Sequence, residues 1–248
     1  RTDARGARVA VAALLAFAQE SHGVRSFQIR PGLESARIKA DVSAADRRPP
    51  VPSARDSYTR FVSDYAVDLA LRVHPDASLR GVCAAVGDVD DEVRGFAERL
   101  VEIMRAEDGI GLAAPQVGVK RRIFVCDVPA DPRETESPAD KPGVAWATDG
   151  PLVCIDPTVS EPSDERTPFE EGCLSIPGIR GDVIRPERIR LTATGIDGEA
   201  FSMVADGLLA RCIQHELDHL NGVLIIDKFT QMSRLKNRRK IRELEAKA

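Results

Sequence analysis

The chain has 248 residues, of which 43% are hydrophobic and 30% are charged. These values are typical of a soluble globular protein with enough chain for a sizeable core, and no apolar run is long enough to span a membrane. The formal net charge of −4 argues against bulk attraction to nucleic acid, and we expect no specific DNA partner. The five cysteines are odd in number and widely spaced, which favours a reducing compartment over a disulfide framework.

Residues 1–60 differ from the rest because they are basic and contain loop-like, Pro-rich tracts. An apolar run at 9–18 follows several arginines and ends in a small-x-small triplet, the outline of a targeting presequence. The alternatives are a short helix on a disordered extension and translated sequence upstream of the true start. We expect a cytoplasmic enzyme if the source is bacterial, and a plastid or mitochondrial one if this segment is a presequence. The chemistry is expected in a domain at 61–248.

The sequence becomes orderly from residue 65, and residues 72–76 are predicted to be a turn that closes a short strand. Apolar side chains at spacings of three and four predict a helix at 90–106, with Asp90 or Asp91 as its N-cap. Strands are predicted at 122–128 and 152–155. The Pro-rich, acidic segment at 129–150 between them is long enough to count as a surface loop insertion.

The C-terminal part is predicted to alternate strands and helices. Asn221-Gly222 supplies a helix stop signal. The predicted elements are strands at 184–194 and 199–204, a helix at about 205–220, a short strand at 223–226 and a basic helix at 233–248.

The helix at 205–220 contains an H-E-x-x-H pattern that begins at His215. Histidines four residues apart on a helix lie on one face, so His215 and His219 can reach a single metal ion. Glu216 would lie beside that ion without binding it, where a general base acting on water belongs. The alternative is an ordinary amphipathic helix with a solvated polar face. The chain has only four histidines, and two of them are in this pattern.

A third metal ligand is required, because a catalytic zinc-type site uses three protein ligands and an open position. Ile225 stands where the metzincin pattern has its third histidine, so the ligand is expected upstream. Cys173 is a candidate because it lies in a glycine-flanked loop between strands. Cys83, Cys126 and Cys154 lie in apolar contexts and are predicted to be buried.

Three segments resemble, in order, the signature motifs of the peptide deformylase family. They are G-I-G-L-A-A-P-Q at 109–116, E-G-C-L-S at 171–175 and Q-H-E-L-D-H at 214–219. The resemblance covers roughly 65–235. It implies an α+β fold, in which antiparallel sheets wrap around the helix with H-E-x-x-H and a further helix ends the chain. It also implies a metal-dependent hydrolase that removes the formyl group from the N-terminal formyl-methionine of new polypeptides and releases formate.

The resemblance assigns the metal ligands as Cys173, His215 and His219. A thiolate ligand suits iron(II) as well as zinc. We expect one divalent cation, Fe(II), with zinc, nickel and cobalt as alternatives.

The resemblance also implies the catalytic roles. Glu216 would take a proton from the attacking water and pass it to the departing amine. The Gln116 side-chain amide and the Leu174 backbone N–H would stabilise the oxyanion. Gly111 would let the chain pass close to the substrate.

A pocket for the methionine side chain is expected to be lined by Ile110, Leu208 and Cys212. Arg211 is predicted to point to its rim with its stem packed along the wall, and a solvated helix charge is the alternative.

The basic helix at 233–248 is predicted to hold the enzyme on the ribosome surface, where nascent chains emerge. The alternative is an amphipathic helix that packs Leu235, Ile241 and Leu244 on the body of the protein. Two other functions were weighed: a metallopeptidase that cuts internal peptide bonds, and an inactive homologue that serves as a binding module.

Overall fold

The structure, a computed structural model, describes residues 69–130 and 143–246. The predicted extension at 1–60 and residues 131–142 of the predicted loop lie outside these ranges. Within the described ranges, no helix is both long and apolar enough to cross a membrane.

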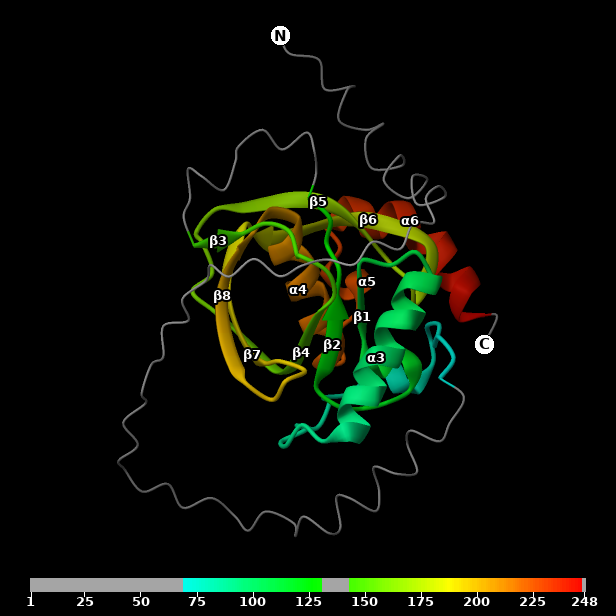
Figure 1. Cartoon of the computed structure of the whole chain (residues 1–248). Coiled ribbons are helices and arrows are strands. Elements are labelled where there is room, and N and C mark those ends of the chain that lie inside the picture. The colour runs from blue at the N-terminus through cyan, green and yellow to red at the C-terminus, as the bar shows by residue number, and fades with distance from the viewer. Residues whose placement is uncertain (1–68, 131–142, 247–248) are drawn as a thin grey trace, which may run out of the picture. The chain divides into compact units, whose positions relative to one another are not determined.

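Two sheets, antiparallel but for one pairing, form the β part of the fold (Figure 1). The larger has six strands in the order β1-β2-β4-β7-β8-β3, and only the β3–β8 pairing is parallel. Its strands are β1 (Gly111–Ala113), β2 (Ile123–Cys126), β3 (Val144–Ala145), β4 (Leu152–Ser160), β7 (Arg188–Thr194) and β8 (Ala200–Asp206). The smaller sheet pairs β5 (Arg166–Cys173) with β6 (Ile176–Pro186).

Helix α4 (Gly207–Leu220) is the central helix. It contacts β1, β2, β4, β7 and β8 of the larger sheet and β6 of the smaller one, and Figure 1 shows the strands arranged around it. Leu209, Ile213 and Leu220 on this helix are fully buried. The predicted α+β fold with sheets around a central helix is confirmed.

The ends of α4 follow from local capping. Ala205 and Asp206 were predicted to be helical, but they complete strand β8. The Asp206 carboxylate accepts a hydrogen bond from the Gly207 N–H at 2.8 Å, so the helix begins one residue after this cap. The helix ends at the predicted stop, where Asn221 is the C-cap and Gly222 has a φ of 72°.

Helix α3 (Asp91–Ala106) matches its prediction. The Asp90 side chain accepts a hydrogen bond from the Val93 N–H at 2.9 Å, as an N-cap does. Phe96 and Leu100 are among its buried residues, and the helix packs against β1 and β2.

Two strand predictions are wrong. The segment 184–194 is not one strand, because β6 ends at Pro186 and β7 begins at Arg188 in the other sheet. Proline has no N–H to continue a ladder, so the chain can change sheets there. The segment 223–226 is not a strand either. The Asp227 carboxylate accepts the Leu224 N–H at 2.8 Å, and this cap starts the short helix α5.

The predicted loop at 129–150 contains a short strand in its described part. Val144 and Ala145 form β3 and pair with Val204 and Ala205 at the edge of the larger sheet. Two residues are too few for a hydrophobic alternation to reveal a strand.

Helix α6 (Gln231–Glu245) begins slightly before the predicted basic helix and packs against β6. Its buried side chains are polar: Ser233 accepts the Asp182 N–H at 2.9 Å, and Asn237 donates to the Arg180 carbonyl at 2.8 Å. Leu235 is 65% exposed, but Ile241 and Leu244 are partly buried and pack against the hydrophobic cluster that contains Val183 and Phe229. The alternative of a helix packed on the body therefore holds for two of its three residues.

Among the described residues, the remaining short helices are η2 (Ala77–Leu79), η3 (Ala114–Val117) and α5 (Ile225–Lys228). The predicted turn is present at His74 and Pro75, but the described residues before it do not form the predicted short strand.

Candidate metal centre and active site

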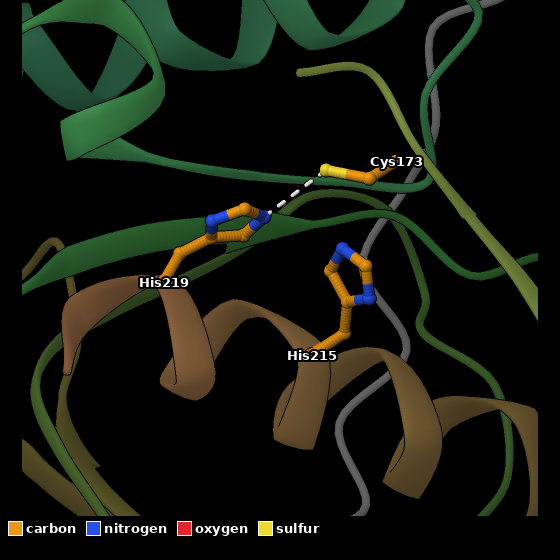
Figure 2. A group of neighbouring side chains, drawn as sticks. All are labelled: Cys173, His215 and His219. Carbon is orange, nitrogen blue, oxygen red and sulfur yellow. Dashed lines mark hydrogen bonds between the residues drawn. The ribbon is translucent and has the colours of Figure 1, made fainter. Parts of the chain in front are cut away.

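The three predicted metal ligands converge. The potential ligand atoms of Cys173, His215 and His219 all lie within 4.8 Å of one another. Cys173 Sγ is 3.2 Å from His219 Nε2, and the two imidazole centroids are 5.1 Å apart. Figure 2 shows both rings projecting from α4 toward the sulfur.

Local structure explains this convergence. The spacing of four residues puts both imidazoles on one face of α4. Cys173 was expected in a loop, but it is the last residue of β5 and pairs with Ile176 across the tight turn of the hairpin. The sulfur is therefore held by a paired strand, which fixes its position better than a loop would.

The donor set fits a divalent cation. One thiolate and two imidazoles are the soft and borderline ligands that zinc and iron(II) accept, and three protein ligands leave a fourth position open. Among the residues that the structure describes, this is the one group of at least three Cys, His, Asp or Glu side chains found close enough to hold an ion.

A buried carboxylate, that of Glu171, contacts the His215 ring. Glu171 Oε2 lies 3.1 Å from His215 Nδ1, and the Glu171 residue is 6% exposed. Arg185 donates to both Glu171 oxygens, at 2.7 and 3.0 Å. Burial opposes ionisation of Glu171, but the hydrogen bonds from His215 and Arg185 outweigh it and lower the pKa of the carboxyl from 4.5 to about 2.

The two histidines differ in their environment. Burial acts to lower the pKa of both rings. For His215 it is outweighed by hydrogen bonds to Cys173 and Glu171, which hold the pKa well above its usual value. For His219, burial and the nearby charge of His215 hold the pKa well below its usual value. The Nδ1 atom of His219 has no hydrogen-bond partner among the described residues.

Glu216 lies beside the three ligands on α4. Its side chain is buried, and its Oε2 atom has no hydrogen-bond partner within the described part of the chain. Burial raises the pKa of its carboxyl from 4.5 to about 7. The carboxylate lies against Gly111: a Cβ at that position would overlap Glu216 Oε1 and would be 2.8 Å from Cys212 Sγ. Glycine is therefore required where β1 crosses α4.

Gln116 is fixed by hydrogen bonds at both ends of its amide. Its Oε1 accepts the Ala113 N–H at 2.7 Å, which leaves Nε2 facing Ser175 Oγ at 3.2 Å and Cys173 Sγ at 3.7 Å. Leu174, in the turn directly after Cys173, packs toward α3. The structure thus brings both predicted oxyanion donors next to the sulfur ligand.

The comparisons with known proteins agree with this arrangement. Residues 69–235 match the family model described as polypeptide deformylase. The chain is 38% identical over 171 residues to a peptide deformylase of Maricaulis maris, covering 69% of this chain and 90% of the relative. It is 44% identical over 174 residues to one of Methylocella silvestris, covering 70% and 82% respectively. The crystal structure of peptide deformylase from Ehrlichia chaffeensis superposes with a TM-score of 0.65 at 34% identity, covering 73% of this chain and 98% of that chain.

The chain belongs to the peptide deformylase family. The family is metal-dependent, which agrees with the group formed by Cys173, His215 and His219. A second Ehrlichia chaffeensis structure, a complex with actinonin, has a TM-score of 0.62 at 36% identity, covering 71% of this chain and 97% of that chain.

Two of the three residues predicted to line a methionine pocket are in contact, and the third packs on the same hydrophobic cluster. Cys212 is buried, and its thiol lies 3.4 Å from the Ile110 carbonyl. Ile110 and Leu208 are partly buried and pack against the hydrophobic cluster that contains Cys212. Cys83, Cys126 and Cys154 are buried free thiols, as predicted.

The predicted position of Arg211 at a pocket rim is wrong. The residue is only 5% exposed, and its guanidinium donates to Glu171 Oε1 at 3.1 Å and lies 5.1 Å from the Phe169 ring centroid. The ion pair with Glu171 draws the side chain inward, because a buried carboxylate is stabilised by charged donors.

Sequence reasoning missed two residues that support the site. Ser175 is fully buried and accepts from Gln116, but its place in the E-G-C-L-S motif gave no hint of this contact. Arg185 could have been found, because β6 alternates and Val183 and Arg185 share its buried face. A charged residue at an inward position implies a buried partner.

Proposed function

We propose that the site formed by Cys173, His215, His219 and Glu216 removes the N-terminal formyl group from N-formyl-methionyl nascent peptides and releases formate. The observation that carries this proposal is the convergence of one sulfur and two imidazoles beside a buried glutamate, one oxygen of which has no hydrogen-bond partner among the described residues. Hydrolysis of an amide needs a place for water, a proton acceptor and donors for the oxyanion. We assign a metal-bound position to the water, Glu216 to the proton, and the Gln116 amide and Leu174 N–H to the oxyanion.

Cys173, His215 and His219 would hold the metal. A divalent cation bound there supplies Lewis acidity, which lowers the pKa of water and polarises a carbonyl oxygen. We propose Fe(II) as the native ion, because a thiolate with two imidazoles suits iron(II) as well as zinc.

Glu216 would move the proton. Its Oε2 atom, which no described residue hydrogen-bonds, would accept a proton from water and then give it to the departing amine. Burial excludes competing solvent from the carboxylate. A Cβ at Gly111 would overlap Glu216 Oε1, so the backbone of β1 runs directly against the Glu216 carboxylate.

Gln116 and Leu174 would stabilise the oxyanion. The Gln116 amide is oriented by the Ala113 N–H, so its Nε2 donors are directed to the side of the site where Cys173 lies. The Leu174 N–H follows Cys173 in the chain. A preorganised donor of this kind is typically worth about 3 kcal/mol in the transition state.

Ile110, Leu208 and Cys212 would form the pocket for the methionine side chain. Burial of that side chain in an apolar pocket contributes about 2 kcal/mol. We further propose that Gly111 and Leu174 keep the site too narrow for an acetyl group. Efficient cleavage of an N-acetyl-methionyl peptide would contradict that part of the proposal.

Helix α6 is proposed as the ribosome-binding element. Its exposed face is rich in Arg and Lys, and Arg238 and Arg239 are exposed. We expect R238Q/R239Q to weaken co-sedimentation with ribosomes, because contacts to RNA phosphates depend on charge. Turnover of a formylated tripeptide should stay within about twofold of wild type.

The control removes the same charge from another helix. Arg99 and Arg105 are exposed on α3, so R99Q/R105Q tests net charge without touching α6. Substitutions are preferable to deletion of α6, since Ser233 and Asn237 hydrogen-bond the backbone of β6. Equal co-sedimentation of both variants would rule the ribosome proposal out.

The enzymatic proposal is tested by anaerobic purification, metal analysis and an assay of formate release from a formyl-methionyl tripeptide. We expect about one metal ion per chain, loss of formate release on chelation, and recovery on addition of Fe(II). A casein digest should remain uncut. Release of internal casein fragments, or failure to bind any metal, would contradict the proposal.

A further inference from the structure

Residues 72–74, the bridging segment, belong to no helix or strand and hydrogen-bond two separate parts of the candidate active site. The Arg72 N–H donates to the Gln116 carbonyl at 2.7 Å, and the His74 N–H donates to the Ser175 carbonyl at 2.8 Å. Gln116 belongs to η3, whereas Ser175 lies in the turn between β5 and β6. One short segment therefore holds the main chain of two elements that are far apart in the sequence.

Both contacts bear on the side chain of Gln116. Its Nε2 donates to Ser175 Oγ at 3.2 Å, and its Oε1 accepts the Ala113 N–H at 2.7 Å. The bridging segment thus binds the main chain of Gln116 and also the main chain of the residue that contacts its amide. The position of a preorganised donor matters, since a misplacement of about 1 Å can lower a rate about a hundredfold.

The His74 side chain joins the bridging segment to helix α6. The residue is 8% exposed, and its Nε2 lies 3.3 Å from Glu245 Oε1 at the end of α6. Its Nδ1 atom is buried and has no hydrogen-bond partner among the described residues. A buried polar atom without a partner lowers the free energy of unfolding, so stability alone does not account for an imidazole at this position.

The residues on either side of the bridging segment have contacts of their own. Leu71 packs on the same hydrophobic cluster as Leu174, the residue before Ser175. On the other side, the Asp76 carboxylate accepts the Ser78 N–H at 2.8 Å and caps η2. Because these contacts do not involve the imidazole, its loss should shift the bridging segment and not unfold it.

We propose that His74 is a positioning residue for the Gln116 amide: its imidazole, paired with Glu245, fixes the bridging segment and the two carbonyls that this segment binds. The inference rests on the proposed function, in which the Gln116 amide stabilises the oxyanion. Because the oxyanion forms only in the transition state, a loss at His74 should appear in kcat and not in KM.

The first test replaces the imidazole and retains its bulk. H74L removes both ring nitrogens, and kcat for formate release from a formyl-methionyl tripeptide should fall about tenfold, with KM within about twofold of wild type. H74Q keeps a side-chain amide that can donate to Glu245, so its kcat should stay within about threefold of wild type. Metal content should be the same in all three proteins.

E245A removes the same contact from its exposed end. The Glu245 side chain is 47% exposed, so this variant is expected to fold even if H74L does not. Its kcat should fall about threefold with KM unchanged. The double variant H74L/E245A should lose no more activity than H74L alone, because both substitutions break one contact.

A double-mutant cycle with Gln116 distinguishes positioning from a structural role. In a Q116A background, H74L should change kcat by less than about twofold, because the amide that His74 positions is no longer present. A structural role would give the same fold loss with and without Q116A. V93A is the control for a general loss of stability, because it removes buried apolar volume from α3, and its kcat should stay within about twofold of wild type.

The outcomes separate the inference from the proposed function. If wild type releases no formate after its metal is restored, the proposed function fails and the inference fails with it. If wild type is active, but H74L and E245A both keep kcat within about twofold, the inference alone is overturned. An equal loss by H74L in the Q116A background, by H74Q or by V93A would also overturn it.

Discussion

Helices α4 and α6 have similar lengths and treat their charged residues in opposite ways. Arg211, Glu216 and His219 on α4 are buried, whereas the buried positions of α6 are Ser233 and Asn237. The Arg239 side chain on α6 is 87% exposed. Several ionisable side chains of α4 are therefore enclosed by the protein, while those of α6 lie at its surface.

This difference shows where chemistry can be located. A buried ionisable group keeps one geometry, and its protonation responds to its neighbours, as the raised pKa of Glu216 and the lowered pKa of Glu171 show. A solvated arginine is screened by water and salt, so it acts on charged partners that come close to it and has little influence on the buried site. We therefore expect α4 to govern turnover and α6 to govern association.

The largest expected effect comes from Glu216. E216Q keeps the size of the side chain but removes its ability to accept a proton, and formate release should fall between about 10²-fold and 10⁴-fold. Metal content should remain, since Glu216 is not one of the converging ligands. The matched control is E102Q on α3, where the Glu102 side chain is 67% exposed. If E216Q kept most of the activity, α4 would not supply the proton acceptor.

The next effect comes from the contact between β1 and α4. In G111A the new Cβ would overlap the Glu216 carboxylate, and the displaced carboxylate should lower kcat by about a hundredfold. G95A is the control, because nothing lies within 4 Å of a Cβ at that position of α3. It should leave turnover unchanged and raise the free energy of unfolding by about 1 kcal/mol. Equal activity of the two variants would show that β1 does not set the position of Glu216.

A smaller effect, on the free energy of unfolding, is expected when one arginine of α4 or of α6 is replaced. R211M breaks a buried ion pair and should lower the free energy of unfolding by about 3 kcal/mol. R239M removes an exposed pair with Glu243 and should change it by less than about 0.5 kcal/mol. Urea unfolding followed by circular dichroism measures both values. Similar losses would mean that burial does not distinguish the charges of the two helices.

The last prediction concerns α5, the short helix between α4 and α6 in the chain. Asp227 caps α5 by accepting the Leu224 N–H, so D227A should lower the free energy of unfolding by about 1 kcal/mol. Formate release should be unaffected in the folded protein. A large loss of activity would instead show that α5 transmits strain to the site.

The sequence alone predicted the helices whose apolar residues repeat regularly and the side chains whose spacing is typical of metal ligands. The helix at 90–106 was predicted with Asp90 or Asp91 as its cap, and Asp90 is the cap; the two imidazoles on one helical face were predicted as well. The short strand β3 and the helix α5 were not, because they depend on partners far along the chain or on a single cap.

The error at Arg211 has a physical cause. Helical spacing alone indicates that Arg211 lies four residues before His215 and on the same face. What it could not indicate was the ion pair with Glu171, which lies 40 positions away on β5. An arginine is rarely buried without a paired carboxylate. The position of the Arg211 guanidinium is therefore determined by this tertiary contact, which helical spacing cannot predict.

The central claim is that Cys173, His215 and His219 bind one divalent cation. X-ray absorption spectroscopy of the zinc-loaded protein measures its ligands directly. We predict one sulfur at about 2.3 Å and two imidazole nitrogens at about 2.0 Å, with the sulfur shell lost in C173S. A first shell without sulfur in the wild-type protein, or one unchanged by C173S, would contradict the account.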